Sequence, residues 1–195
     1  MRRARKWKKR ARRTGVAEGR SRPRSPFSAA LAMLARRPYS VAELNRALEK
    51  KFPSNPANAD AIARLRQLGY LDDKKVAEQL AYSLAHNRAY GPHRVRRELK
   101  SKLVDYKHIE PAIDAAYREI PARDVLELAL DKKIRTLKLP LTRARVYSLC
   151  QTLMRKGFNS GDIIKAVRAR PELRPVAEEI EPALLEDSDE AKKEF

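Results

Sequence analysis

Few side chains in this sequence have the types and spacing that chemistry requires. Asp72 and Asp73 form a carboxylate pair, but neighbouring residues on a helix point about 100° apart, so they suit helix capping better than metal binding. His86, His93 and His108 lack the close ligand spacing of a zinc site. The sequence also contains no glycine-rich phosphate loop ending in Gly-Lys-Ser/Thr. We therefore expect a protein that is not an enzyme and that needs no metal or cofactor.

Cys150 is the only cysteine, so the chain cannot form an internal disulfide. It occupies an apolar position of a helical pattern, which predicts a buried thiol rather than a reactive one. No apolar run approaches the roughly 18 residues that span a bilayer, and the basic amino terminus lacks the apolar core of a secretory signal. We expect a cytoplasmic protein that does not bind membranes. A transit peptide is the weaker alternative, because the start of the chain lacks an amphipathic pattern.

Positive charge is the strongest functional signal in the composition. The chain carries 44 Lys and Arg against 25 Asp and Glu, which gives a formal net charge of +19. Residues 1–26 hold 12 cations and one acid, whereas residues 175–195 hold two cations and eight acids. The residues between them therefore keep a large positive excess. Such a balance predicts nucleic acid or another strongly acidic surface as the partner.

The first 26 residues are expected to form a disordered basic arm, because like charges repel and no helical apolar face is present. Trp7 suits stacking on a base, although an incidental exposed tryptophan is the more common case. The arm cations that we expect to meet nucleic acid are Arg2, Arg3, Arg5, Lys6, Lys8, Lys9, Arg10, Arg12 and Arg13.

Helices must position the remaining cations. Between residues 69 and 113, apolar residues recur at helical spacing in three runs, and a start signal precedes each run. The second run begins at Gly91-Pro92 and places Val95, Leu99 and Leu103 on one face, with cations on the other. We interpret this helix as one that packs inward and meets an anionic surface outward. A merely solvated basic face is the alternative.

The three-helix pattern repeats along the chain. A step of 51 links the helix-start residues Ser40, Gly91 and Thr142, whereas a rival step of 54 between the last two units aligns Leu99 with Leu153. The sequence leaves both registers open. Either one predicts a tandem array of three helical units, each too small to bury its apolar face alone and therefore packed on its neighbour.

The resulting prediction is an all-α fold, built as an elongated array of three three-helix units. We expect the basic arm at 1–26, unit one at 27–71, unit two at 72–120, unit three at 121–172 and a mobile acidic tail at 173–195. An alternative for the tail is a fold-back onto the basic body, where it would compete with phosphates. Ser40 and Glu43 are expected to form a reciprocal capping box at the second helix of unit one.

The cations that we expect to bind the partner lie on and beside the second helices of units two and three. They are Arg88, Arg94, Arg96, Arg97, Lys100, Arg143, Arg145, Arg155 and Lys156.

Four short motifs follow one another along the three units. They are Arg36-Arg37-Pro38-Tyr39-Ser40 with Glu43-Leu44, Gly69-Tyr70-Leu71-Asp72-Asp73 followed by Val76-Ala77, Gly91-Pro92-x-Arg94-Val95, and Arg155-Lys156-Gly157-Phe158 with Ile163. Together they resemble the signature of the RecX family of regulatory proteins over about residues 27 to 170. Leu103 departs from the pattern, because the family usually places glycine there, and this puts the local turn geometry in question.

The resemblance implies a bacterial, cytoplasmic, monomeric protein that binds the filament of the RecA recombinase on DNA. Proteins of this family lie in the filament groove and modulate, most often inhibit, ATP hydrolysis and strand exchange in recombination, DNA repair and the SOS response. No catalytic residue is expected, since differential affinity for one filament state would supply the energy. The alternative is a stand-alone nucleic-acid-binding protein that acts without RecA, with affinity that falls steeply as salt rises.

Overall fold

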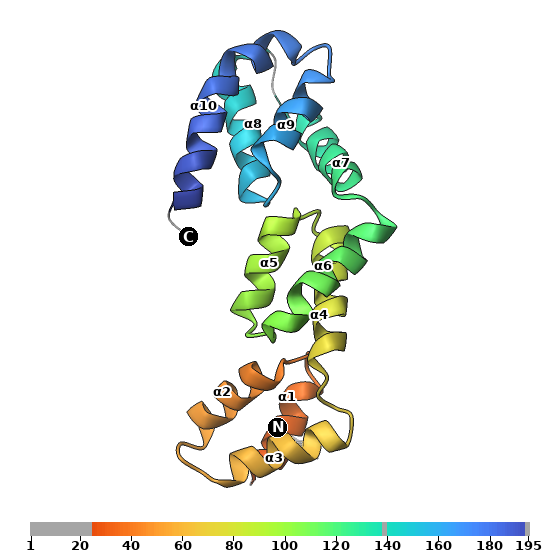
Figure 1. Ribbon diagram of the computed structural model, residues 1–195, viewed down its shortest axis with the longest axis vertical. Helices are drawn as coiled ribbons and strands as arrows, with labels where there is room; N and C mark the ends of the chain where they lie inside the picture. Colours follow the sequence, from red (N-terminus) through yellow and green to blue (C-terminus); the bar gives the residue numbers. More distant parts are fainter. Residues whose placement is uncertain (1–24, 138–139, 194–195) are drawn as a thin grey trace, which may run out of the picture.

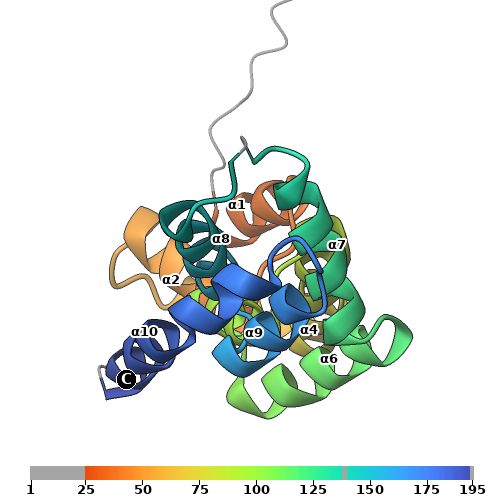
Figure 2. The same cartoon turned by 90° about the horizontal axis from the view of Figure 1, so that it is seen from above.

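The computed structural model describes residues 25–137 and 140–193, and every regular element in these ranges is a helix. The helices form three units stacked along the long axis of the molecule (Figure 1), and the units overlie one another when seen from above (Figure 2). Each unit has its own cluster of buried apolar residues. The predicted all-α array of three units is therefore confirmed. Predictions for arm residues 1–24, including Trp7, lie outside the described residues.

Unit one packs three helices around a core that includes the fully buried Leu44, Leu48 and Leu65. Its first helix starts earlier than expected, because Ser25 caps it and Pro26 suits its first turn. The predicted arm therefore ends before residue 25. The helices are α1 (Pro26–Leu34), α2 (Val41–Lys51) and α3 (Ala57–Gln67).

Unit two begins at the expected signals. Asp72 accepts a hydrogen bond from the Lys75 amide at 3.1 Å, Pro92 occupies a first-turn position, and Asp105 caps the last helix. Leu103 does not extend the buried face that Val95 and Leu99 form, because it lies past the end of its helix. The helices are α4 (Asp73–Tyr82), the π-helical turn η1 (Ser83–Asn87), α5 (Pro92–Ser101) and α6 (Tyr106–Glu119).

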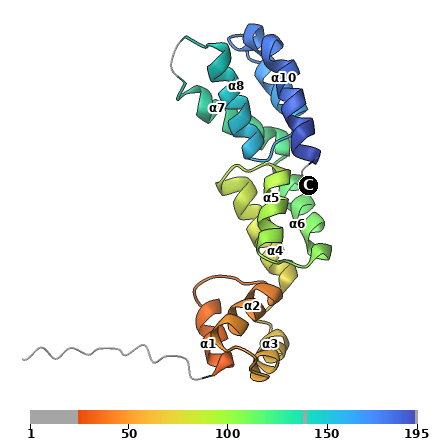
Figure 3. The same cartoon turned by 90° about the vertical axis from the view of Figure 1, so that its left-hand side faces the viewer.

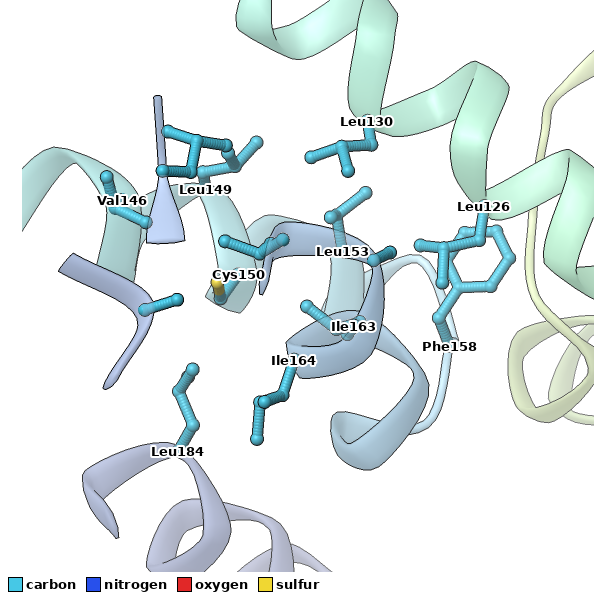
Figure 4. Close-up of a cluster of buried hydrophobic side chains, with 14 of the residues drawn as sticks. Leu126, Leu130, Val146, Leu149, Cys150, Leu153, Phe158, Ile163, Ile164 and Leu184 are labelled. Atoms are coloured by element: carbon cyan, nitrogen blue, oxygen red, sulfur yellow. The ribbon is translucent and has the colours of Figure 1, made fainter. Parts of the chain in front are cut away.

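Unit three has the largest core of the three. Figure 4 shows the Cys150 sulfur within this core, among apolar side chains that include Leu153 and Leu184. The predicted burial of the Cys150 thiol is therefore confirmed, and burial raises its pKa to about 11. The helices are α7 (Ala122–Ile134), α8 (Arg143–Arg155), α9 (Ser160–Arg168) and α10 (Arg174–Lys193).

The expected mobile tail is wrong, because residues 174–193 form α10. This helix packs on α8 and α9 and runs back toward unit two (Figure 3). Leu173, Ala177, Ile180 and Leu184 are buried in the unit-three core. They recur at helical spacing, which the acidic composition of the segment obscured. Unit three therefore contains four helices, and its boundary lies beyond residue 172.

The two rival repeat registers are each correct in part. The step of 51 aligns the caps of the second helices, Ser40, Gly91 and Thr142. Past that helix the step becomes 54, which aligns the cap residues Asp105 and Asn159. The change arises because α8 has 13 residues where α5 has 10.

No helix in the described part of the chain is long and apolar enough to cross a membrane.

Candidate functional site: a helix column with two junctions

The second helices of the three units stack end to end, and we call α2, α5 and α8 the helix column (Figure 1). The end of α8 meets the start of α5, and the end of α5 meets the start of α2. Each contact brings carbonyl groups of one helix end to the amide end of the next. Helix ends otherwise leave these groups unpaired.

Junction two joins α8 to α5 through backbone groups. The Gly91 amide donates to the Lys156 carbonyl oxygen at 2.7 Å, and the His93 amide donates to the Gly157 carbonyl oxygen at 3.2 Å. A Cβ atom on Gly91 would lie only 2.3 Å from the Gly157 oxygen. Gly157 also has a φ of +89°, which glycine adopts without strain. The close contact therefore requires glycine on both sides.

Arg94 belongs to junction two rather than to a free basic face. Its guanidinium donates to the Arg155 carbonyl oxygen at 3.1 Å and lies 4.2 Å from the centre of the Tyr90 ring. The Tyr117 hydroxyl in turn donates to the Tyr90 carbonyl oxygen, and burial raises the pKa of Tyr117. The bond to Arg155 holds the start of α5 against unit three, whereas the contacts of Tyr90 and Tyr117 lie within unit two.

Junction one joins α5 to α2 through side chains. Ser40 is fully buried, and its hydroxyl accepts from the Glu43 amide at 3.0 Å and donates to the Lys102 carbonyl oxygen at 2.7 Å. The Val41 amide donates to the Asp73 carboxylate at 2.8 Å. Both members of the aspartate pair therefore cap helices, but Asp73 caps the helix of the neighbouring unit.

The predicted capping box is only half formed. Ser40 caps α2 as expected, but the Glu43 carboxylate pairs with Arg37 at 2.8 Å and with Lys102 at 3.4 Å. Burial alone would raise the pKa of Glu43. The hydrogen bond from Arg37 and the charge of Lys102 outweigh this effect and hold the pKa below its ordinary value. Glu43 is thus the central anion of junction one.

Four of the nine predicted partner-binding cations, Arg94, Arg96, Arg145 and Lys156, use their side chains in contacts within the fold. Arg96 makes a bidentate ion pair with Glu110 at 2.6 and 2.7 Å, and this pairing holds the pKa of Glu110 below its usual range. Arg145 donates to the Pro140 carbonyl oxygen at 2.7 Å. Arg88 and Arg155 contribute backbone carbonyl oxygens to junction two, and Arg155 is itself exposed.

The outward cations of the helix column are fewer than expected. Arg97, Lys100 and Arg143 are exposed, and none of them makes an ion pair with another described residue. Arg46 of α2 occupies the place of Arg97 one repeat earlier and is also exposed. The step of 51 would have identified it from the sequence.

The pKa of Lys156 at junction two is shifted from its ordinary value. Burial lowers the pKa of Lys156, and the charges of Lys133, Lys132 and Arg94 lower it further. Lys132 and Lys133 lie in the last turn of α7.

The described residues contain no group of three or more His, Cys, Asp or Glu side chains that could hold a metal ion. A cleft of about 460 Å³ lies between units one and two, and four of its charges form local pairs, Lys75 with Asp72 at 3.7 Å and Lys107 with Asp105 at 3.0 Å. The helix column is therefore the better candidate for a functional surface.

Comparisons with known proteins agree with this architecture. The family model for the second three-helix domain of RecX matches residues 72–113, which is most of unit two. The regulatory protein RecX of Stenotrophomonas maltophilia (strain R551-3) is 32% identical over 155 residues, covering 78% of this chain and 91% of that protein. That of Bacillus subtilis (strain 168) is 33% identical over 145 residues, covering 72% of this chain and 52% of that protein.

Solved structures show the same fold. The crystal structure of RecX from Lactobacillus salivarius superposes with a TM-score of 0.62 at 19% sequence identity, and the match covers 74% of this chain and 93% of that one.

Proposed function

Because this chain belongs to the RecX family of regulatory proteins, we propose that it binds the RecA recombinase filament on DNA and inhibits its ATP hydrolysis and strand exchange. It does so as a cytoplasmic monomer without catalytic residues. Its relatives are named regulatory proteins, which supports a regulator. RecA as the target is the further step that the family resemblance suggests.

The helix column is the observation that carries this proposal. A filament presents the same surface at regular intervals, and a rod of repeated units can present matching groups at regular intervals. Arg46 and Arg97 lie one repeat apart, each opposite the buried face of its own helix. We infer that this side of the column faces the acidic surface or the DNA phosphates of the filament.

Regulation by binding to the filament requires no catalytic reaction in the regulator itself. A protein that binds one filament state more tightly shifts the filament toward that state. A differential affinity of about tenfold corresponds to roughly 1.4 kcal/mol, which a few charge contacts supply.

The direct test measures RecA-catalysed ATP hydrolysis on single-stranded DNA with and without this protein. We expect a lower rate at amounts stoichiometric with RecA. An unchanged rate, together with no binding of the protein to the filament, would remove the proposal.

The column is tested by the double substitution Arg97→Glu with Lys100→Glu. Arg94 is left unchanged because it holds junction two. We expect filament affinity to fall by at least about tenfold while helicity by circular dichroism stays the same. The matched control is Lys74→Glu with Arg118→Glu, which changes the same charge on exposed positions of α4 and α6. Equal losses in both variants would show that only total charge matters.

The net charge of +19 and the basic arm favour a second candidate, a nucleic-acid-binding protein that acts without RecA. This role predicts direct DNA binding with a steep salt dependence. Deletion of residues 1–26 should weaken that binding. Unchanged DNA affinity would show that the arm does not contact DNA.

A further inference from the structure

The boundaries between neighbouring units are narrow. Within the described residues, every extensive contact between helices joins two helices of the same unit. A cleft opens at each boundary, of about 460 Å³ between units one and two and of about 520 Å³ between units two and three. Neighbouring domains move relative to each other unless a large apolar interface holds them together. The contacts that cross each boundary therefore decide whether it is rigid.

Apolar contacts hold units two and three together. Tyr117 of α6 packs against the core of unit two and also against the core of unit three, and Ala89 of unit two packs against the unit-three core as well. Junction two adds two backbone hydrogen bonds and the close approach of Gly91 to Gly157. Bending at this boundary would expose apolar surface to water and separate packed backbones, so it is opposed.

The boundary between units one and two lacks a shared apolar contact. Among the described residues, no apolar side chain packs against the cores of both units. Three sets of polar contacts cross this boundary, namely the Ser40 hydroxyl with the Lys102 and Leu103 carbonyl oxygens, the Val41 amide with the Asp73 carboxylate, and the Lys102 ammonium group with the Glu43 carboxylate. We call the contacts of the two carboxylates the latch. Partly exposed charge contacts weaken as salt screens them.

The chain itself provides a pivot at this boundary. Leu71 is buried in the unit-one core, whereas α4 begins two residues later at Asp73 and leads into unit two (Figure 1). Only Asp72 lies between them, with an extended backbone at φ −145° and ψ 101°. Hinges in proteins are commonly a few residues at the end of an element, whose torsion angles absorb the motion.

We propose that junction one is a hinge held closed by the latch. When the latch opens, unit one swings about Asp72 as a rigid body, while units two and three move as one body. Arg46 lies on unit one and Arg97 on unit two, so opening changes the spacing between these two outward cations. The inference goes beyond the proposed function, because the motion belongs to the free protein and requires no RecA.

Distances between spin labels on the full chain test the hinge by double electron–electron resonance. Ala63→Cys with Ala115→Cys reports across junction one, and Ala115→Cys with Ser148→Cys reports across junction two, since these residues are exposed on helices of different units. Cys150 is buried and should take up no label.

Salt should open the hinge in these labelled proteins. We expect the distance distribution across junction one to widen at least about twofold between about 0.1 M and about 1 M sodium chloride, where the screening length falls from about 10 Å to about 3 Å. The distribution across junction two should keep its width. Any other pattern, including equal widening at both junctions or widening at neither, overturns the proposal.

Removing the latch should open the hinge without added salt. Asp73→Ala with Lys102→Gln removes a partner from each latch contact, so we expect the wide distribution across junction one already at about 0.1 M salt. The matched control is Glu78→Ala with Lys74→Gln, which makes the same changes of charge in an exposed ion pair within α4. An unchanged distribution in the latch variant, or the same widening in the control, overturns the proposal.

An unaltered distribution across junction two and unaltered helicity by circular dichroism verify that the latch variant remains folded. The salt response tests the same hinge with every latch residue in place.

Discussion

The two junctions of the helix column differ in chemistry although they join the same elements. Junction two brings two backbones into contact at Gly91 and Gly157. Junction one keeps the backbones further apart and bridges them through the side chains of Ser40, Asp73 and Glu43. One arrangement of helices can thus be fixed either by close packing or by a buried polar network. The first should be sensitive to volume and the second to charge.

Residue size explains why the junctions diverged. Ser40 and Leu103 stand at the places of Gly91 and Gly157, and their side chains prevent the close approach. The Ser40 hydroxyl spans the gap by donating to the Lys102 and Leu103 carbonyl oxygens. Leu103 holds a φ of +53°, a conformation that glycine adopts more easily. The departure noted at residue 103 is therefore accommodated by backbone strain rather than by a different turn.

The largest expected effect comes from adding volume to junction two. Gly91→Ala places a Cβ atom 2.3 Å from the Gly157 oxygen, so the backbones must separate and both cross-junction hydrogen bonds weaken. We expect a loss of about 3 kcal/mol of stability by urea denaturation, with fast exchange of the His93 amide.

The control for this substitution is Gly161→Ala, where the nearest atom, the Asn159 side-chain oxygen, lies 3.3 Å from the added Cβ. It should be nearly neutral, because alanine also favours the helix. A Gly91→Ala protein as stable as the control would show that junction two is loosely packed.

Removing a hydroxyl should damage junction one by a smaller amount. Ser40→Ala leaves the Glu43 amide and the Lys102 carbonyl oxygen without their buried partner. We expect a loss of about 1–2 kcal/mol in denaturation experiments. Thr142→Ala is the matched control, because Thr142 has the same place in unit three but makes no side-chain cap. Equal losses in the two variants would exclude a special role for the cross-junction bond.

Acid should loosen junction one and spare junction two. The folded-state pKa of Glu43 is below its ordinary value of 4.5, so its stabilisation is full above pH 4.5 and is lost as pH falls through the folded-state pKa. We expect faster exchange of the Val41 amide relative to the Gly91 amide below this pH, by an amount that corresponds to under about 1 kcal/mol. Glu43→Gln should abolish the difference. A difference that persists in this variant would assign the acid sensitivity to another carboxylate.

The smallest effect is expected from giving junction one a glycine. Leu103→Gly relieves the positive φ, which costs a non-glycine residue about 1 kcal/mol, but loses the contacts of a half-buried side chain. We expect a net gain of at most about 0.5 kcal/mol, with slower exchange of the Val41 amide. Ser54→Gly relieves a φ of +54° outside the junctions and should leave that amide unchanged. If both variants slowed exchange of the Val41 amide equally, the effect would come from relief of backbone strain in general and not from junction one.

Local signals predicted the helices well. The helix-start signals act only on residues within one helical turn. Each of the three helices of unit two begins at its signal, which is Asp72, Pro92 or Asp105. The repeat likewise predicted three units, since its apolar spacing reflects packing within each unit. Residues 173–184 were misread because the acidic composition of the whole segment was weighed above its apolar spacing.

The candidate site was predicted less well. Charge periodicity identifies a basic helix but not the partner of each cation, so Arg96 and Arg94 were assigned outward roles that Glu110 and the Arg155 carbonyl oxygen already occupy.

The sequence by itself determined which segments before residue 170 are helical, how many units exist and that the body is strongly basic. These properties depend on side-chain periodicity and on a count of charges, and both are local or additive. Only the tertiary structure decided that the second helices form one column and that Glu43, the central anion of junction one, has no counterpart in junction two. Contacts between units depend on how residues far apart in the sequence approach one another. No short-range pattern in the sequence predicts them.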